Sequence, residues 1–420
     1  MTINRDRLYK FPWSKTDNAG GWVEVTDECD LSCPGCYRKK LEGHRPLDEV
    51  KKDISLCKKL TNCDSMAISG GEPLQYPHIV DVVDFVYSNG MKPVLLTNGE
   101  PLTWDLAVRL KKAGLHKILF HVDFNQGRPG WEGKNEIEMN ELRQEYADLI
   151  WKLKGVQCGF HLTIVRSSLK HIPEVIEWGR RNIHKVQHLS FIAFRGLPLT
   201  DGLEYMANGS KIDPNSLPNS YSDLDKISIT SDEMFEIVNN HFPDSHPCAY
   251  LGGTAAPETY KFLVMTNIGS RKRIYGVVGA RTIEMAQTLY HLFKGRYLSS
   301  SRNPRVGKKI FALSVVDREV RKALINFLKE TIKNPLRIFD RISLQTINFQ
   351  QPREVFQGET NLCDGCLNMM IYKGELINSC RLDEYRLFGA PVEPVLDVNM
   401  RRKIEREAVQ SLARNSIEKL

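Results

Sequence analysis

Segments of two periodicities alternate along the first 196 residues of the chain. Runs rich in β-branched and aromatic residues predict strands, and apolar residues at helical spacing predict helices. The predicted strands are Trp22–Thr26, Ser65–Ser69, Lys92–Leu96, Lys117–Asp123, Gln157–Val165 and Gln187–Phe194. The predicted helices are Leu47–Leu60, Pro77–Ser88, Trp104–Ala113, Glu136–Leu153 and Ile172–Asn182. Such repeats predict an α/β fold with parallel strands and right-handed crossovers.

The regular alternation stops after residue 196. Residues 197–225 are rich in Gly, Pro, Asn and Ser and predict a loop or linker. Residues 369–378 predict a β-hairpin with its turn at Lys373-Gly374. Helical patterns return further along the chain, over Ser231–Asn240, Glu284–Phe293, Arg318–Ile332 and, as a basic amphipathic helix, Met400–Leu420.

Three cysteines follow the first predicted strand with the spacing C-x3-C-x2-C, at Cys29, Cys33 and Cys36. Iron–sulfur clusters are normally held by four thiolates, and structural zinc sites also have four closed ligands. Three thiols in one loop therefore favour a cluster with one open metal position. A zinc site with a distant fourth ligand, or unreactive buried cysteines, are the alternatives.

The cysteine loop and the segment Gly70-Gly71-Glu72-Pro73, one βα unit later, resemble motifs of the radical S-adenosylmethionine (radical SAM) superfamily. Glycines allow backbone to approach a ligand closely, and a carboxylate pairs with an ammonium group. The resemblance covers about residues 20–196 and implies an open (β/α)6, TIM-like partial barrel. It also implies an enzyme that cleaves S-adenosylmethionine to a 5′-deoxyadenosyl radical, which abstracts hydrogen from an unactivated carbon.

The resemblance assigns roles to residues in the cysteine loop and at the predicted strand ends. The three thiols would hold a [4Fe–4S] cluster, and the Gly-Gly-Glu-Pro segment would contact the amino group of S-adenosylmethionine. Asp123 is the expected ribose ligand, whereas His121 is either catalytic or a buried structural histidine. The full set of candidates is Cys29, Cys33, Cys36, Tyr37, Gly70, Gly71, Glu72, Pro73, Thr97, Asn98, His121, Asp123 and His161. Thr97 and Asn98 have a second interpretation, as caps of the next turn, and the adenine contacts are unassigned.

A second cysteine group lies beside the predicted hairpin, at Cys363, Cys366 and Cys380. It is loosely similar to the twitch and SPASM extensions of radical SAM enzymes, which implies a second, auxiliary [4Fe–4S] cluster. Cys248 or an open iron position would complete it, and zinc is the alternative metal. The three remaining cysteines, Cys57, Cys63 and Cys158, are expected to be packed in the core.

We therefore expect a radical SAM partial barrel over residues 1–196, a mostly helical, substrate-facing extension over 197–345, and an auxiliary-cluster hairpin with a C-terminal helix over 346–420. Hydrophobic residues make up 41% of the chain and charged residues 26%, as in globular proteins. No apolar run is long enough to span a membrane, and the N-terminus has no signal-peptide pattern. Ten cysteines without such a signal favour reduced thiols and metal, hence a cytoplasmic protein.

The net charge of +7 includes basic clusters at residues 271–273 and 302–309. A solvated surface is the simpler interpretation, and a membrane surface or an anionic substrate is the alternative. Nothing in the chain resembles a nucleic-acid-binding motif.

The expected function is that of an oxidoreductase, in which the auxiliary cluster assists oxidation or C–C or C–S bond formation on a lipid-like or other small-molecule substrate. An electron donor such as flavodoxin or ferredoxin would be a partner. A peptide-modifying maturase (crosslinking or epimerisation) and a non-enzymatic iron–sulfur or zinc scaffold are the alternatives.

Overall fold

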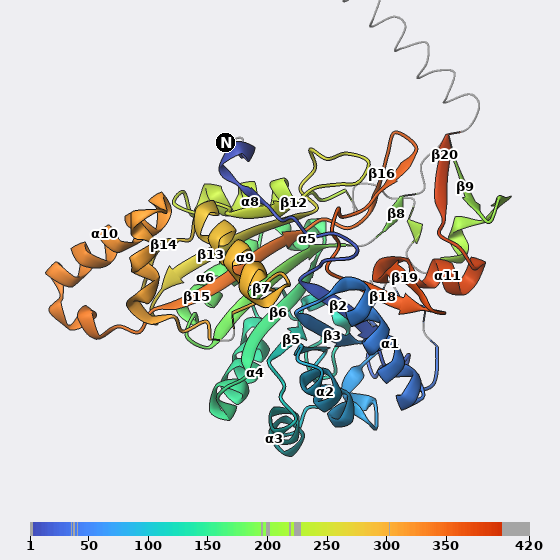
Figure 1. Ribbon diagram of the computed structural model, residues 1–420, viewed down its shortest axis with the longest axis horizontal. Coiled ribbons are helices and arrows are strands. Elements are labelled where there is room, and N and C mark those ends of the chain that lie inside the picture. The colour runs from blue at the N-terminus through green and yellow to red at the C-terminus, as the bar shows by residue number, and fades with distance from the viewer. Residues whose placement is uncertain are drawn as a thin grey trace, which may run out of the picture.

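A single twisted sheet runs through most of the protein, with helices packed around it (Figure 1). The computed structural model describes residues 3–34, 36, 38–39, 41–194, 196–198, 202–217, 220–221, 228–301 and 303–396. Within this part of the chain the main sheet has 11 strands in the order β1-β12-β13-β15-β7-β6-β5-β4-β3-β2, with β14 beside β13. The protein is thus a mixed α/β fold with a parallel region, as the alternating pattern predicts.

The six predicted parallel strands form consecutive neighbours in this sheet. They are β2 (Gly20–Glu24), β3 (Ser65–Ser69), β4 (Lys92–Thr97), β5 (Lys117–His121), β6 (Gln157–Ile164) and β7 (Val186–Ala193). Each pairs in parallel with the next one along the chain. Their carboxyl ends therefore lie on one edge of the sheet.

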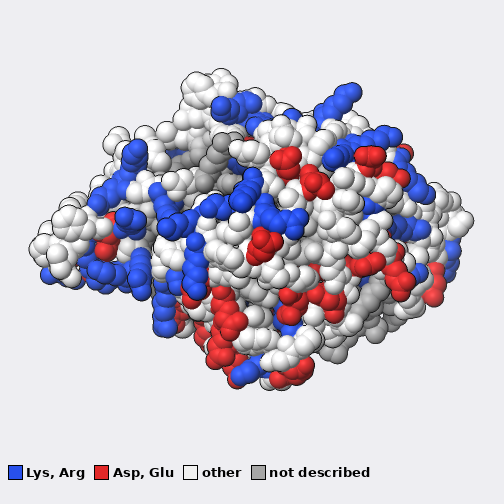
Figure 2. Space-filling view, turned by 90° about the horizontal axis from the view of Figure 1, so that it is seen from below, with Lys and Arg blue, Asp and Glu red and all other residues white. Residues whose placement is uncertain are grey.

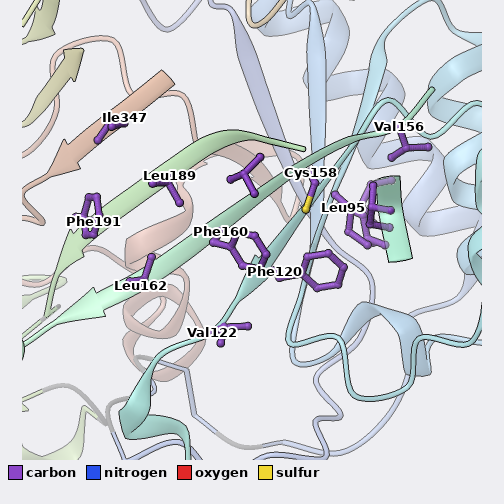
Figure 3. Close-up of a cluster of buried hydrophobic side chains, with 14 of the residues drawn as sticks. Leu95, Phe120, Val122, Val156, Cys158, Phe160, Leu162, Leu189, Phe191 and Ile347 are labelled. Atoms are coloured by element: carbon purple, nitrogen blue, oxygen red, sulfur yellow. The ribbon is translucent and has the colours of Figure 1, made fainter. Parts of the chain in front are cut away.

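Helices cover the outer face of these strands (Figure 1). They are α1 (Leu47–Thr61), α2 (Ile79–Ser88), α3 (Trp104–Lys112), α4 (Asn140–Leu153), the short α5 (Arg166–Leu169) and α6 (Ile172–Arg181). Alternation along each strand sends Phe120, Phe160 and Leu189 into a shared buried cluster (Figure 3). The opposite face of the same strands is left to line the interior.

The second half of the chain extends the same sheet, which the sequence pattern did not predict. The added strands are β1 (Tyr9–Lys10), β12 (Ala249–Leu251), β13 (Phe262–Gly269), β14 (Ile274–Val277) and β15 (Ser343–Gln350). β15 pairs in parallel with β7, and β13 pairs antiparallel with β15. Because most residues of β13 are buried on both faces, this strand shows no alternation in sequence. Residues on both sides of position 196 thus share one sheet, while the predicted division into three domains remains a prediction.

The remaining helices are α8 (Ser231–His241), α9 (Ala280–Lys294), α10 (Arg318–Lys333) and α11 (Leu382–Phe388). α8 and α10 match the predicted ranges to within one residue, and α9 begins four residues before its predicted start at Glu284. The stretch predicted to be a loop instead contains, in its described part, the short strands β8 (Leu197–Pro198), β9 (Leu203–Ala207), β10 (Ser210–Lys211) and β11 (Ser220–Tyr221). β9 also pairs with β20 (Glu393–Leu396), and β16 (Glu354–Phe356) pairs with β17 (Glu359–Asn361). The predicted helix over residues 400–420 lies outside the described residues.

The predicted hairpin near the second cysteine group is confirmed. Strands β18 (Met369–Tyr372) and β19 (Glu375–Asn378) pair antiparallel. Lys373 and Gly374 between them have φ angles of 48° and 85°, the left-handed values that a type I′ turn requires.

Candidate active site

A cavity of about 330 Å³ lies on the inner face of the parallel strands. It extends from the strand starts, at Ser65 and Lys117, to the carboxyl ends, at Asn98 and Asp123. Many of the sequence-predicted residues line it, namely Cys29, Cys33, Cys36, Gly70, Gly71, Thr97, Asn98, His121, Asp123 and His161. Glu72 and Pro73 are not among the lining residues, and Tyr37 lies outside the described part of the chain.

The three thiols of the first cysteine group open on this cavity. Cys29 is exposed, and Cys33 and Cys36 are half-buried. Burial raises the pKa of Cys33 to about 12, and the nearby Asp123, Cys36 and Cys29 add to the rise. Bound metal would offset this by stabilising the thiolates. Three sulfur donors from one loop fit the ligand chemistry of an iron–sulfur cluster.

The paired glycines at the end of β3 hold this loop against the strand. The Gly71 N–H donates to the Thr26 carbonyl at 2.8 Å, and the Glu72 N–H donates to the Glu28 carbonyl at 2.6 Å. A Cβ atom at Gly71 would lie 2.1 Å from the Glu28 carbonyl oxygen, which is a clash with backbone. Gly70 has a φ of 144° and would clash with Thr26 in the same way. The glycines are therefore required for the docking of the cysteine loop itself.

The Glu72 side chain joins the ends of β3 and β4 and does not reach the cavity wall. Its Oε1 accepts hydrogen bonds from the Thr97 hydroxyl at 2.6 Å and the Leu74 N–H at 2.8 Å. Its Oε2 accepts the Asn98 N–H at 2.6 Å. Burial raises the pKa of Glu72 to about 7, although these hydrogen bonds act in the opposite direction. The carboxyl group thus positions Thr97 and Asn98, which line the cavity.

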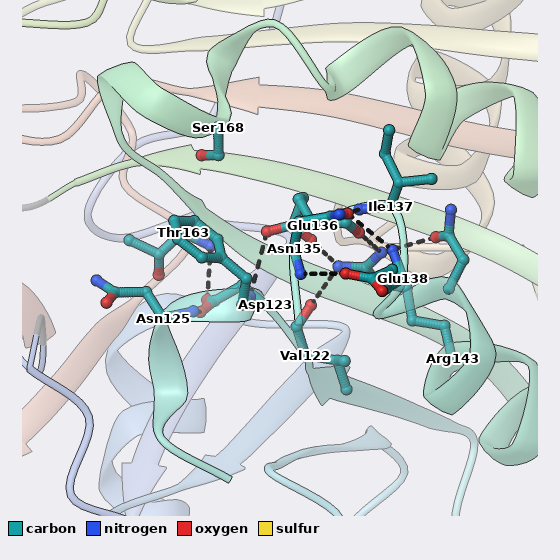
Figure 4. A network of polar contacts seen from close by, with 12 residues as sticks. Val122, Asp123, Asn125, Asn135, Glu136, Ile137, Glu138, Arg143, Thr163 and Ser168 are labelled. Carbon is teal, nitrogen blue, oxygen red and sulfur yellow. Dashed lines mark hydrogen bonds and ion pairs between the residues drawn. The ribbon is translucent and has the colours of Figure 1, made fainter. Parts of the chain in front are cut away.

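His121 and Asp123 form a pair where β5 ends. His121 Nε2 lies 2.9 Å from Asp123 Oδ2 and 3.0 Å from Thr163 Oγ1. The Asp123 carboxylate is 2% exposed and also accepts the N–H groups of Asn125 and Thr163 (Figure 4). Burial acts to raise the pKa of Asp123, but His121 and the backbone donors outweigh it and hold the pKa below its usual value. His121, whose side chain is 43% exposed, is the more accessible member of the pair.

Two buried arginines that the sequence analysis missed support these strand ends. Arg128 donates to the carbonyls of Asn98 and His121, both at 2.6 Å, and so joins β4 to β5. Arg143 donates to the Val122 carbonyl at 2.9 Å and forms an ion pair with Glu136 (Figure 4). No spacing or motif marks either residue, because their partners are backbone carbonyls or loop residues that only the fold brings near.

The second cysteine group reaches the same cavity from the other side. Cys363 and Cys366 line it, and with Cys380 they also line a smaller cavity of about 30 Å³. The hydrogen bond with Cys366, burial and the charges of Cys366 and Cys380 raise the pKa of Cys363 well above its usual value. Cys248 lines neither cavity, and its thiol donates to the Val264 carbonyl at 3.3 Å, so its placement does not support a fourth ligand.

In the described part of the chain, no three His, Cys, Asp or Glu side chains are arranged as a ready-made metal site. Thiols of both cysteine groups nevertheless line one cavity. Cys57, Cys63 and Cys158 are buried in the core, as predicted.

Comparison with known proteins identifies the domain that carries this site. Residues 23–164 match the model of the Radical SAM superfamily. The probable GTP 3′,8-cyclase of Methanocaldococcus jannaschii is 26% identical over 185 residues, which are 41% of this chain and 59% of that protein. The Fe-coproporphyrin III synthase of Methanosarcina barkeri is 25% identical over 161 residues, 36% of this chain and 39% of that protein. The chain thus spans less than two thirds of either relative.

Solved structures with some similarity include SuiB of Streptococcus suis bound to the precursor peptide SuiA. The TM-score is 0.39 at 15% identity, with 55% of this chain and 46% of SuiB covered, which is too low to support a functional assignment. The sequence match confirms the expected radical SAM domain, which this chain shares with enzymes of that superfamily. The twitch or SPASM character of the C-terminal part stays a prediction.

Proposed function

We propose that this radical SAM enzyme uses the cavity lined by its cysteine loop to bind S-adenosylmethionine and a small-molecule substrate side by side. The observation that carries the proposal is that three thiols from one loop face a cavity which also receives polar groups from the ends of β4, β5 and β6. A scaffold without catalytic function, the main alternative, has no need for a cavity of this size between its metal ligands.

The cysteine loop is the proposed holder of a [4Fe–4S] cluster. Cys29, Cys33 and Cys36 would bind three irons, and S-adenosylmethionine would take the fourth position. When bound and reduced, such a cluster supplies the electron that cleaves S-adenosylmethionine to a 5′-deoxyadenosyl radical. The protein residues bind, orient and exclude water around these groups.

The strand ends are the proposed binding site for the rest of S-adenosylmethionine. Backbone of Gly70 and Gly71 and the polar groups of Thr97 and Asn98 line the cavity beside the cysteine loop, where its amino and carboxylate groups would lie. Asp123 remains the proposed ribose ligand, with His121 and His161 from the same wall. Glu72 would act through Thr97 and Asn98, because its own oxygens are already bound.

The second cysteine group is the proposed site of an auxiliary [4Fe–4S] cluster. Cys363 and Cys366 line the same cavity as the first group, so a cluster there would face the substrate. A cluster in this position suits the removal of an electron after hydrogen abstraction, and so favours oxidation or bond formation over simple isomerisation. Zinc bound by Cys363, Cys366 and Cys380 is the alternative.

The cavity between the two cysteine groups favours a substrate with an apolar body. Its middle is lined by apolar side chains, among them Trp22, Val94, Leu96, Leu119, Leu251 and Phe262. Small-molecule sites typically combine such walls with a few polar groups. We therefore favour a lipid-like or other small molecule over a ribosomal peptide, which remains the second candidate.

The end of the molecule that carries α10 is the proposed contact with an anionic membrane surface (Figure 1). Ile332, Leu336 and Phe339 are each between 68% and 82% exposed. Lys and Arg side chains gather over the same end of the molecule (Figure 2). Apolar side chains ringed by basic ones bind the surface of anionic lipid. No helix in the described residues is long and apolar enough to cross a bilayer.

Electron paramagnetic resonance of the reduced, anaerobically reconstituted protein tests the proposed cofactor site. We expect a cluster signal that changes when S-adenosylmethionine is added, and no such change in Cys33→Ala. Cys158→Ala, which changes a thiol in the core, is the matched control and should respond as the wild type does. A wild-type signal that is indifferent to S-adenosylmethionine would contradict the proposal.

Iron analysis separates the two clusters. About eight irons per chain are expected with both clusters, and about four with one cluster only. Four irons with one zinc would retain the radical chemistry and replace the auxiliary cluster by zinc.

A further inference from the structure

The end of the cavity opposite the cysteine loop contains a buried lysine. Lys117 is the first residue of β5, and it lines the cavity on the same strand face as Leu119 and His121. The Lys117 side chain lies at the strand starts, together with Ser65, and the residue is only 8% exposed.

The Lys117 ammonium group has no hydrogen-bond or ion-pair partner among the residues that the structure describes. Its neighbour Lys92, at the start of β4, is fully paired: it donates to Asp64 at 2.6 Å and to the Ser300 carbonyl at 2.7 Å. Burying an ammonium group without a partner is costly. Burial, together with the charge of Lys92, lowers the pKa of Lys117 to about 8.

A histidine without a hydrogen bond lies near the same end of the cavity. His188 on β7 lines the cavity, and its ring centroid is 5.9 Å from that of His161. Burial, followed by the charges of Lys117 and His161, holds the pKa of His188 well below its usual value. The neutral ring has one N–H to donate, and nothing in the described chain accepts it.

A short segment after α9 runs along the strand starts beneath these side chains. The Ser299 hydroxyl donates to Asp64 at 2.8 Å, and the Gln157 amide donates to the Ser301 carbonyl at 2.6 Å. Ser299 and Ser300 are themselves cavity-lining residues. The polar groups of this segment are thus bound to the strand starts, while those of Lys117 and His188 are not.

We propose that Lys117 and His188 form an anion-binding subsite, which takes a carboxylate or phosphate group of the substrate at the end of the cavity remote from the cysteine loop. The apolar wall around Val94 and Leu119 would hold the substrate body between this group and the cysteine loop. The identity of the ligand as the substrate rests on the proposed function, whereas the binding of an anion does not. The radical chemistry needs no cation at this end, so the subsite serves to select and orient the substrate.

Calorimetric titration of the holoprotein with three eight-carbon probes tests this subsite. Octanoate and octyl phosphate carry the two candidate anions, and octan-1-ol is the neutral control. We expect at least one of the two anions to bind about 10-fold or more tighter than octan-1-ol, because charge-assisted hydrogen bonds are the strong ones. The tighter anion identifies the head group. Equal binding of all three probes, or no binding of either anion, would overturn the proposal.

Lys117→Met keeps the length and apolar stem of the side chain and removes the charge. It should weaken anion binding by about 10-fold or more, with no matching effect on octan-1-ol. Lys92→Met, at the neighbouring strand start but with its partners elsewhere, should leave the preference for the anion in place. Anion binding that survives in Lys117→Met would refute the assignment.

These titrations contain neither S-adenosylmethionine nor reductant. A protein that binds the anion but never cleaves S-adenosylmethionine would refute the proposed function and leave the subsite in place. A protein that cleaves S-adenosylmethionine but shows no preference for the anion would refute the subsite and leave the proposed function in place.

Discussion

Individual buried charges divide into two kinds in this protein. Arg128, Arg143 and Lys92 each have carboxylate or carbonyl partners, and they hold strand ends or strand starts together. The ammonium group of Lys117 has no such partner in the described chain, even though the residue is buried, with only 8% of its surface exposed. Removing the partner of a paired buried charge is strongly destabilising, and a buried charge that has no partner in the fold likewise lowers stability and is available to a ligand.

Replacing Lys117 by methionine should stabilise the protein at pH 7. The pKa of Lys117 is lowered from 10.5 to about 8, so the unfolded state binds more protons between these values and wild-type stability rises with pH there. Below pH 8 the penalty is fully present, on the order of 3 kcal/mol at about 1.4 kcal/mol per pKa unit. The midpoint of thermal unfolding of Lys117→Met should therefore exceed that of the wild type at pH 7, and the gain should shrink towards pH 10. A variant less stable than the wild type at pH 7 would argue for a structural role.

Binding of the anion probes should depend on the charge of Lys117. Its ionisable neighbours across the cavity end are Lys92 on β4 and His188 on β7, and His188 stays neutral near pH 7. Affinity should be constant below about pH 7 and fall by up to about 10-fold per pH unit above pH 8, as Lys117 loses its proton. Dissociation constants measured from pH 6.5 to 9.5 test this, and Lys117→Met should give a flat profile. A wild-type profile that is equally flat would contradict the charge of Lys117 as the cause.

At the scale of elements, the junctions between strands and loops position the residues of the candidate site. The Gly71 and Glu72 N–H groups after β3 dock the cysteine loop through hydrogen bonds to the Thr26 and Glu28 carbonyls. The sequence motif predicts that Gly70 and Gly71 let the backbone approach a ligand. A sequence alone does not show that the backbone of the cysteine loop packs against them. The structure supplies that partner.

Gly71→Ala should dislodge the cysteine loop. The added Cβ would meet the Glu28 carbonyl at 2.1 Å, so the backbone next to Cys29 must shift. Iron content per chain after anaerobic reconstitution should fall by about half, the share of one of two clusters. Gly130→Ala is the matched control, since it has a positive φ of 77° but nothing within 4 Å of the added atom. Wild-type iron content in Gly71→Ala would contradict the docking role.

The sequence predicted the elements that repeat and missed those that do not. The six βα units and the hairpin were predictable, because each has a local period or a local turn signal. Strands β13 and β15 were not, since the partners of β15, which are β7 and β13, lie far along the chain and most residues of β13 are buried on both faces. The same holds for the site: cysteines and glycines stand out by spacing, whereas the unpaired state of Lys117 exists only once the strands are side by side.

At the scale of the whole molecule, the two cysteine groups face one cavity and the α10 end forms a separate surface (Figures 1 and 2). The apolar side chains of that end include Ile332 in α10 and Phe339 in the following turn (Pro335–Phe339). A membrane contact there would place a lipid-like substrate near the enzyme without requiring a spanning helix.

Co-sedimentation with vesicles tests the proposed membrane surface. Binding to vesicles with anionic phosphatidylglycerol should exceed binding to pure phosphatidylcholine and should fall with added salt. Ile332→Asp combined with Phe339→Asp should reduce it several-fold, because both side chains are about 80% exposed and apolar. Trp104→Asp, an exposed aromatic residue on α3, is the control. If the wild type forms concentration-dependent dimers and does not bind vesicles, and the double variant loses these dimers, the surface would be assigned to contact with a second copy of the chain.

The release of 5′-deoxyadenosine from S-adenosylmethionine is the most direct test of the central claim. Anaerobic protein with a reductant such as dithionite should produce it, and Cys33→Ala should not, because the cluster that supplies the electron loses a ligand. Cys158→Ala should retain the activity. Release that continues in Cys33→Ala, or its absence from iron-replete wild-type protein, would contradict the account.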